Sequence, residues 1–150
     1  MGPSPLPLVI TRCISAPVPI KKIRRAALLL YRKERVPLSR TTAVVFCSDG
    51  AIRRLNARFR NVDRATDVLS FAFGDEDMLG EIYISTRRAE VQARQYEWSR
   101  QDEILRLFIH GFYHLLGYGH QTVRECLVME EKERTAFTAV SSAVSRARSC

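Results

Sequence analysis

The three histidines of this chain fall in one short stretch, His110-Gly-Phe-Tyr-His114-Leu-Leu-Gly-Tyr-Gly-His120. Residues four apart in a helix lie one turn apart on the same face, so His110 and His114 are expected side by side. Gly117 and Gly119 favour the end of a helix and a reversal of the chain, which can return His120 to the same point. The stretch therefore predicts a helix ending in a tight turn with three converging imidazoles.

Three converging imidazoles are the ligand set of a catalytic zinc ion with a fourth position open to water. Nickel, copper and iron also suit such ligands, and geometry and availability favour zinc, one ion per chain. A structural zinc would need a fourth ligand, for which Cys126 is the nearby candidate. The remaining alternative is that each histidine only stabilises its helix or turn.

The residue after the first histidine bears on the reaction. The zinc-protease pattern H-E-x-x-H places a glutamate general base there, and this chain has Gly111. The absence of this glutamate counts against peptide hydrolysis by that mechanism. A glycine at this position suits close packing of the helix or the approach of a substrate. Glu103 lies two turns before His110. We expect it to cap or solvate the helix, and the alternative is that it faces the same side as the histidines.

The composition is that of a soluble globular domain. A chain of 150 residues predicts a single domain, and 46% hydrophobic with 27% charged residues excludes global disorder. The four cysteines are widely spaced and form no C-x-x-C, so reduced thiols in a cytoplasmic protein are expected. We find no apolar run long enough for a membrane span and no secretory signal in Met1–Pro7.

The net charge of +8 favours an anionic partner, nucleic acid first. The expected helix over 20–35 is strongly basic, which suits a solvated face or a phosphate-docking surface. A second helix over 50–60 carries Phe59, which is in phase with Ile52 and Leu55 and is therefore expected in the core. The arginines interleaved along that helix are Arg53, Arg54, Arg58 and Arg60.

The pattern of apolar residues predicts an α+β fold with a small mixed four-stranded sheet packed with helices. Residues 67–73 and 81–85 are expected to form a hairpin, and Leu127, Val128 and Phe137 to be the apolar contacts of the last helix. Residues 1–7 and about 140–150 are expected to be flexible. The predicted strands are 8–14, 42–48, 67–73 and 81–85, and the predicted helices are 20–35, 50–60, 86–98, 99–117 and 123–139.

Three sequence blocks resemble one known family. H-G-x-x-H-L-x-G-Y-x-H looks like the signature of the YbeY family of bacterial endoribonucleases and rRNA maturation factors. Asn56-Ala-Arg-Phe-Arg60 followed by Thr66-Asp-Val-Leu-Ser-Phe71 is similar to the family's N-x-x-x-R and T-D-V-L-S-F, and Leu79–Ser85 resembles its L-G-D-I-x-I-S. The blocks occur in the family's order over residues 44–120.

The resemblance implies a single-strand-specific, zinc-dependent endoribonuclease of 16S rRNA 3′-end maturation and ribosome quality control. Its partners would be single-stranded rRNA, the ribosome or small subunit, and assembly factors. A metal-activated water would attack the phosphodiester. Arg60, which matches the family's arginine, would bind the phosphate, and His114 would be both a metal ligand and a catalytic residue. Two alternatives stay open: a ribosome-assembly RNA-binding factor with a mainly structural zinc, and a metallopeptidase.

The chain departs from the family pattern at three positions. Gly119 stands where the family usually has Asp before the third histidine, which bears on metal affinity or catalysis. Glu81 replaces the usual Asp and Ala72 the usual Pro. Thr66, Asp67 and Ser70 are expected to be structural. Tyr118, beside the third histidine, suits either base stacking or packing of the turn.

Overall fold

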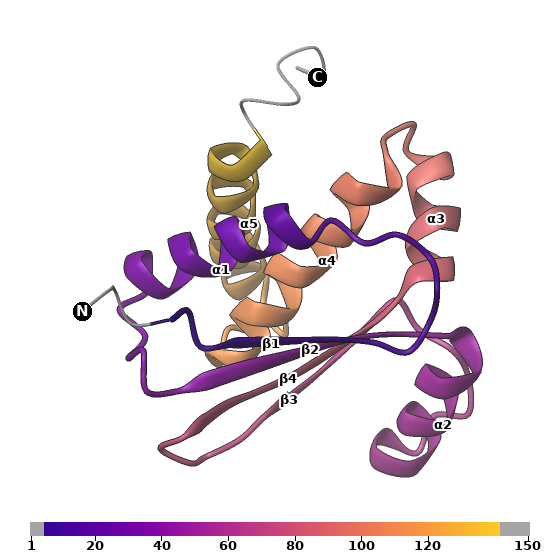
Figure 1. Cartoon of the computed structure of the whole chain (residues 1–150), viewed down its shortest axis with the longest axis horizontal. Helices are drawn as coiled ribbons and strands as arrows, with labels where there is room; N and C mark the ends of the chain where they lie inside the picture. The colour runs from indigo at the N-terminus through magenta and orange to yellow at the C-terminus, as the bar shows by residue number, and fades with distance from the viewer. Residues whose placement is uncertain (1–4, 142–150) are drawn as a thin grey trace.

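The computed structural model describes residues 5–141. Their elements follow in the predicted order, β-α-β-α-β-β-α-α-α (Figure 1). Most bounds lie within a few residues of the expected ones; the fourth strand begins three residues early, at Met78. The elements are β1 Leu8–Arg12, α1 Ile20–Lys33, β2 Thr41–Cys47, α2 Asp49–Arg60, β3 Val68–Ala72, β4 Met78–Ser85, α3 Thr86–Gln95, α4 Arg100–Leu115 and α5 Val123–Ser141.

The strands form one mixed sheet in the order β1-β2-β4-β3. β2 pairs in parallel with β1 and with β4, and β3 pairs antiparallel with β4. The predicted hairpin is therefore confirmed, with Ser70 opposite Ile82. The mixed four-stranded α+β fold is also confirmed, and β1 and β3 are its edge strands.

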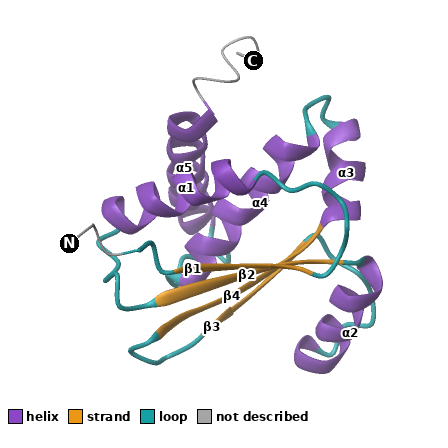
Figure 2. Ribbon diagram, in the orientation of Figure 1, coloured by secondary structure: helices purple, strands orange, loops and turns teal. Residues whose placement is uncertain are grey.

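The two faces of the sheet are covered unequally. Helices α1, α4 and α5 lie over one face, with α3 beside α4, whereas α2 alone lies on the other side, near one end of the strands (Figure 2). The main hydrophobic core fills the space between the sheet and the three-helix layer, where Val44, Phe46, Ile82 and Ile84 are buried. Alternate residues of the same strands point to the second face.

Helix α4 is the central helix of that layer. The Ser99 hydroxyl accepts a hydrogen bond from the Asp102 backbone N–H, which caps the start of the helix. Buried residues occupy most of its circumference, so the helix lies inside the domain. Two of the three predicted metal ligands, His110 and His114, lie in its last two turns, as their spacing predicts.

Helix α1 shows why the first basic stretch folds as it does. Ile23, Ala27, Leu30 and Tyr31 recur at helical spacing and are buried against the core, while the basic residues take the outer side. The Tyr31 hydroxyl lies 2.8 Å from Thr42 Oγ1 of β2 and ties the helix to the sheet. The basic residues of α1 are thus on its solvent side, where the role of a phosphate-docking surface stays a prediction.

Several core predictions are wrong. Phe59 is 58% exposed because its ring lies against the edge strand β3 instead of inside the sandwich. Leu127 and Val128 are also exposed, because α5 is amphipathic only weakly and buries Met129 and Ala136 instead. Phe137 does pack on the core, as predicted.

The ends of the described chain add two observations. Val140 and Ser141 are buried residues of α5, so the predicted flexible tail begins no earlier than residue 142. Residues 1–4 and 142–150 lie outside the described part, and the prediction for them stays a prediction. Within residues 5–141 no helix combines the length and apolarity needed to cross a bilayer.

Candidate metal centre

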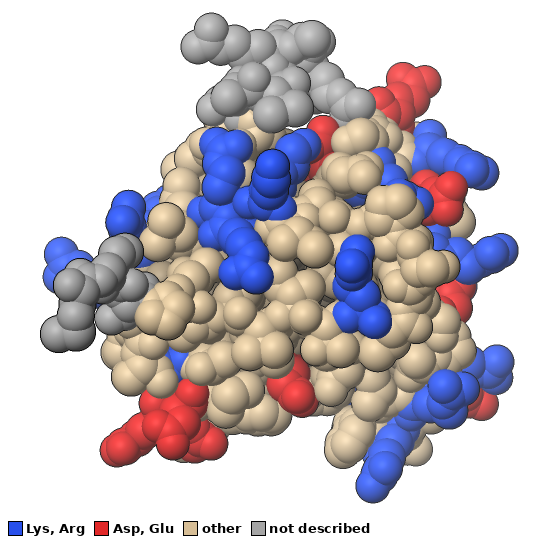
Figure 3. Space-filling view, in the orientation of Figure 1, with Lys and Arg blue, Asp and Glu red and all other residues tan. Residues whose placement is uncertain are grey.

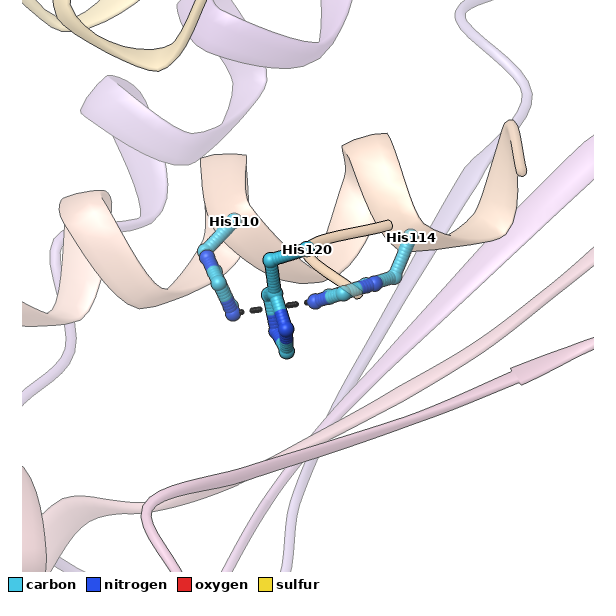
Figure 4. A group of neighbouring side chains, drawn as sticks. All are labelled: His110, His114 and His120. Carbon is cyan, nitrogen blue, oxygen red and sulfur yellow. Dashed lines mark hydrogen bonds between the residues drawn. The ribbon is translucent and has the colours of Figure 1, made fainter. Parts of the chain in front are cut away.

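The three histidine side chains converge on one point beside α4 (Figure 4). One nitrogen from each of His110, His114 and His120 lies within 4.8 Å of the others. The Nε2 atoms of His110 and His114 are 3.1 Å apart, and the His120 ring lies 5.0 Å from that of His114, centroid to centroid. The convergence predicted from the spacing is therefore present.

Local sequence explains how His120 returns to the helix. Gly117 adopts φ +93°, a left-handed conformation that suits glycine, and α4 ends there. Thr122 and Glu125, which follow His120, form a capping box at the start of α5. The Thr122 hydroxyl accepts a hydrogen bond from the Glu125 N–H, and the Glu125 carboxylate accepts one from the Thr122 N–H. The turn is thus fixed at both ends.

Gly111 permits the close approach of α4 to the sheet. A Cβ atom there would lie 2.8 Å from Ile82 Cγ2 and 2.9 Å from Ser70 Oγ, closer than real Cβ contacts. The position faces the strands, and a glutamate side chain would not fit. Of the two explanations given for this glycine, helix packing is confirmed.

A glutamate that the sequence did not single out lies against the cluster. Glu133 of α5 places Oε1 2.6 Å from Nδ1 of His110. A carboxylate on the outer nitrogen favours a proton on Nδ1 and a free lone pair on Nε2, which faces His114. The two residues are 23 positions apart, on different helices. Only the packing of α5 on α4 brings them together.

His114 is held in its neutral form. Partial burial lowers its pKa, and the nearby His110 and His120 lower it further. A backbone hydrogen bond with Tyr118 and the charge of Glu133 oppose this fall in pKa. A neutral imidazole is the form that binds a metal ion, so the lowered pKa favours His114 as a ligand at neutral pH.

Comparison with known proteins agrees with this geometry. The family model described as "Endoribonuclease YbeY" matches residues 15–141. The chain belongs to the YbeY family. A relative from Aquifex aeolicus named "Endoribonuclease YbeY" is 39% identical over 132 residues, covering 85% of this chain and 83% of that protein.

Two further relatives extend the comparison. A protein of the same name from Desulforamulus reducens is 44% identical over 100 residues, which cover 60% of this chain and 65% of that protein. This chain thus spans less than two thirds of that relative's length. The solution structure of TM1509 from Thermotoga maritima matches with a TM-score of 0.65 at 29% identity, over 91% of this chain and 90% of that one.

Arg60, the arginine of the YbeY-like second block, lies outside the histidine cluster but is connected to it. Its Nη2 donates to the Ser70 carbonyl oxygen at 3.4 Å, on the edge strand β3. The Ser70 hydroxyl in turn donates to the Gly111 carbonyl at 3.1 Å, one residue after His110. Arg60 is exposed, so its guanidinium is available to a ligand at this edge.

Thr66 and Asp67 of the second block make structural contacts, as predicted. The Asp67 carboxylate accepts from the Val68 N–H at 2.8 Å and from Gln92 Nε2 at 3.1 Å. The Thr66 hydroxyl also donates to it. These contacts fix the start of β3 against α3, and they hold in place the strand that carries Ser70.

A second glutamate steadies the turn before His120. The Glu34 carboxylate, at the end of α1, accepts from the hydroxyls of Tyr113 and Tyr118 and pairs with Lys132 Nζ. The Lys132 ammonium also lies 5.2 Å from the centroid of the Tyr118 ring. Tyr118 is therefore committed to packing of the turn, one of its two expected roles.

The family departure at Gly119 has a neighbour that bears on it. A Cβ atom at this position would lie 3.7 Å from Glu125 Oε2. An aspartate here would bring a second carboxylate beside Glu125, whereas the glycine leaves that carboxylate free to cap α5. A carboxylate thus lies beside this turn although the family's own is missing.

Two other candidates lie away from the cluster. Cys126 donates its thiol to Glu130 and is not in the histidine group. Glu103 is fully buried and forms a bidentate ion pair with Arg106, with contacts of 2.7 and 2.9 Å. The expectation that it solvates the helix is wrong, because it neutralises a half-buried arginine.

The residues present fit a metal ion. Tetrahedral zinc with nitrogen ligands at ~2.0–2.1 Å separates those nitrogens by about 3.3 Å, close to the 3.1 Å between the two Nε2 atoms. Among the described residues, no cysteine, aspartate or glutamate joins the three histidines as a fourth ligand. Such a set suits a catalytic ion better than a structural one.

Proposed function

We propose that this chain is a zinc-dependent endoribonuclease that cleaves single-stranded RNA. The observation that carries the proposal is the convergence of three histidines, with a carboxylate behind one of them, in a chain of the YbeY family. Its relatives carry the name endoribonuclease. The proposed task is maturation of the 16S rRNA 3′ end and ribosome quality control.

The proposed ligands are His110, His114 and His120, with one zinc ion per chain. A bound zinc ion would lower the pKa of a coordinated water toward about 7 and polarise a phosphoryl oxygen. The chain's own residues prepare that site. Glu133 orients the His110 ring, and burial keeps His114 neutral. His114 is also proposed as a catalytic residue, because as a ligand of the ion it would lie beside the reacting phosphate.

Arg60 is proposed to hold the scissile phosphate. A guanidinium donates two parallel hydrogen bonds to phosphate oxygens and stabilises the charge that develops in the transition state. Its position at the β3 edge, joined through Ser70 to the residue after His110, supports that role. The Ser70 carbonyl restrains the side chain before a substrate arrives.

The surface charge supports an RNA substrate. Lysine and arginine side chains gather over α1 and around α2 (Figure 3). The net charge of +8 attracts a phosphate backbone over long range. We propose single-stranded rRNA, the small ribosomal subunit or ribosome, and assembly factors as partners, and the cytoplasm as the compartment.

The proposal is tested by cleavage of a single-stranded RNA that carries the 16S 3′ end. Highly purified wild type is compared with His114→Ala and Arg60→Ala prepared identically, and zinc content is measured in each. We expect His114→Ala to lose zinc and cleavage. Arg60→Ala should keep zinc and lose roughly 10²–10³-fold in rate, as when one transition-state donor is removed. Arg94→Ala, an exposed arginine on α3, is the matched control.

Each other outcome points to a different function. Equal cleavage by wild type and His114→Ala would mean a contaminating nuclease. Binding of the RNA without cleavage by zinc-loaded wild type would favour the assembly factor with a structural zinc. Cleavage of a peptide that depends on His110 would revive the metallopeptidase, which the packing of Gly111 disfavours.

A further inference from the structure

The second face of the sheet has an aromatic row that the proposed catalytic site does not use. The Phe59 ring of α2 lies 5.5 Å from the Phe71 ring of β3, and Phe71 lies 5.8 Å from Tyr83 of β4, both in edge-to-face contact. Phe71 and Tyr83 are partly buried, whereas Phe59 is 58% exposed. The row therefore presents one accessible aromatic ring at its outer end.

The exposure of Phe59 is unusual for its chemistry. A phenylalanine in phase with Ile52 and Leu55 would ordinarily be drawn into the core. Here the apolar residues that the second face buries, within residues 5–141, are Cys47, Ile52 and Leu69, and Phe59 lies beyond them at the edge strand. Phe71 supports one edge of the ring and fixes its position without covering it.

One arginine lies over this ring, and another follows it in the chain. The Arg58 guanidinium carbon lies 5.3 Å from the Phe59 centroid, and Arg60 follows directly. Arg53 on the same helix is paired with Asp63. An exposed aromatic ring flanked by arginines is complementary to a nucleotide, whose base has a stacking face and whose phosphate is an anion.

The residue after Phe59 is connected to the helix that carries the metal centre. Arg60 reaches the Ser70 carbonyl on β3, and the Ser70 hydroxyl reaches the residue after His110. Phe59 and Arg60 are neighbours at the end of α2. A strand whose phosphate is held at Arg60 would therefore place an adjacent base within reach of Phe59.

We infer that Phe59 is a stacking platform for an unpaired base of the RNA substrate, and that it makes the site selective for single strands. The inference rests on the proposed activity on RNA. A base in a duplex already stacks within the helix and cannot turn its face to the ring, whereas an unpaired base can. When a base binds, the Arg58 side chain either moves away from the exposed face of the Phe59 ring or stacks on the opposite face of the base.

The test compares Phe59→Leu with Phe59→Tyr in the zinc-loaded full chain. Leucine keeps an apolar side chain without an aromatic face, and tyrosine keeps the face. The probe is a short single-stranded oligoribonucleotide with cleavage-resistant phosphorothioate linkages, a fluorescent end label and one 2-aminopurine, whose fluorescence reports stacking. Tyr96→Leu is the matched control, because Tyr96 is a 69% exposed aromatic residue that follows α3.

We expect Phe59→Leu to weaken binding about 10-fold, within the roughly 5- to 150-fold range of one stacked base. It should also remove the change in 2-aminopurine fluorescence. Phe59→Tyr and Tyr96→Leu should behave as wild type, and binding of the matched duplex should stay unchanged in all variants. With unmodified single-stranded and duplex RNA of the same sequence as substrates, cleavage should lose its preference for single strands only in Phe59→Leu.

Three results would overturn the inference. Unchanged binding and fluorescence in Phe59→Leu would show that no base stacks on this ring. Equal losses in the leucine and tyrosine variants would show a packing role. A shift from dimer to monomer in Phe59→Leu, by analytical ultracentrifugation, would make the ring a contact between copies of the chain. If wild type neither binds nor cleaves RNA, the proposed function itself fails, which is a distinct result.

Discussion

The two faces of the sheet differ in how they are covered and therefore in what they can do. On the first face, α1, α4 and α5 bury a continuous core that includes Phe108, Phe112 and Ile82. On the second face, α2 buries a small cluster of Cys47, Ile52 and Leu69. The same strands supply both faces, and the helices alone make the difference.

One face of the sheet makes the histidine site rigid, and the other face offers side chains for contact with a ligand. The first face holds α4 so firmly that two histidines on its remaining exposed stripe have a fixed geometry, as a metal site requires. The second face leaves the Phe59 ring partly exposed beside arginines, as contact with a strand requires. Both meet at β3, where Ser70 touches α4 through its side chain and Arg60 through its backbone.

Truncation of a large side chain on each face should give the largest difference in the free energy of unfolding. Phe112→Ala removes a fully buried ring that packs on Tyr31 and Phe108, so we expect a loss of about 3–5 kcal/mol in the free energy of unfolding. Phe59→Ala removes a largely exposed ring and should lose under about 1 kcal/mol. Urea unfolding followed by circular dichroism measures both. Equal losses would break the comparison.

The reactivity of Cys47 measures how well α2 shields the second face of the sheet from solvent. Burial raises the pKa of its thiol to about 11 from the ordinary 9.0. At pH 8 its thiolate population is thus about 100-fold lower than in the unfolded chain, and its alkylation should slow at least in proportion. The rate should rise about tenfold for each pH unit up to pH 10, because the thiolate is still the minor form there.

Mass spectrometry of peptides labelled with iodoacetamide resolves this cysteine from the others. Exposed Cys13 is the internal reference and should react readily in the folded protein. If Cys47 reacted as fast as Cys13, α2 would open freely, and the second face would be less covered than the structure indicates.

Gly111→Ala probes the contact between α4 and the sheet. The added Cβ would meet Ile82 Cγ2 at 2.8 Å and Ser70 Oγ at 2.9 Å, so overpacking should lower the free energy of unfolding by about 1–3 kcal/mol. Gly74→Ala is the control, because a Cβ there meets nothing within 4 Å. Thermal and urea unfolding provide the measurement. A neutral Gly111→Ala would mean that α4 shifts easily and that the first face is not rigid.

Glu133→Gln tests whether the helical layer also tunes the metal ligands. A neutral amide in place of the carboxylate weakens the hold on His110 Nδ1, and zinc affinity should fall about 10-fold, at the low end of such effects. Zinc competition with a chromophoric chelator measures this without reference to cleavage. Glu131→Gln, on the exposed side of α5 beside Arg134, should leave affinity unchanged. Equal affinities in all three proteins would remove Glu133 from the site.

Much of this protein is determined by local sequence. Periodicity and caps are properties of a few neighbouring residues, so the order of elements, the helical pair His110 and His114 and the stop at Gly117 could be read before the fold was known. The hairpin of β3 and β4 follows for the same reason, because its strands are close in sequence.

What the tertiary structure decided depends on contacts between distant segments. Helical phase places Phe59 with Ile52 and Leu55, but its ring lies against the edge strand β3, outside the buried cluster, and stays exposed. Leu127 is likewise exposed although its position in α5 predicts an apolar contact. The pairing of Glu133 with His110 joins two helices 23 residues apart, and no local pattern encodes that distance. Spacing predicted which histidines gather, whereas packing decided what orients them and which ring beside them is open to a ligand.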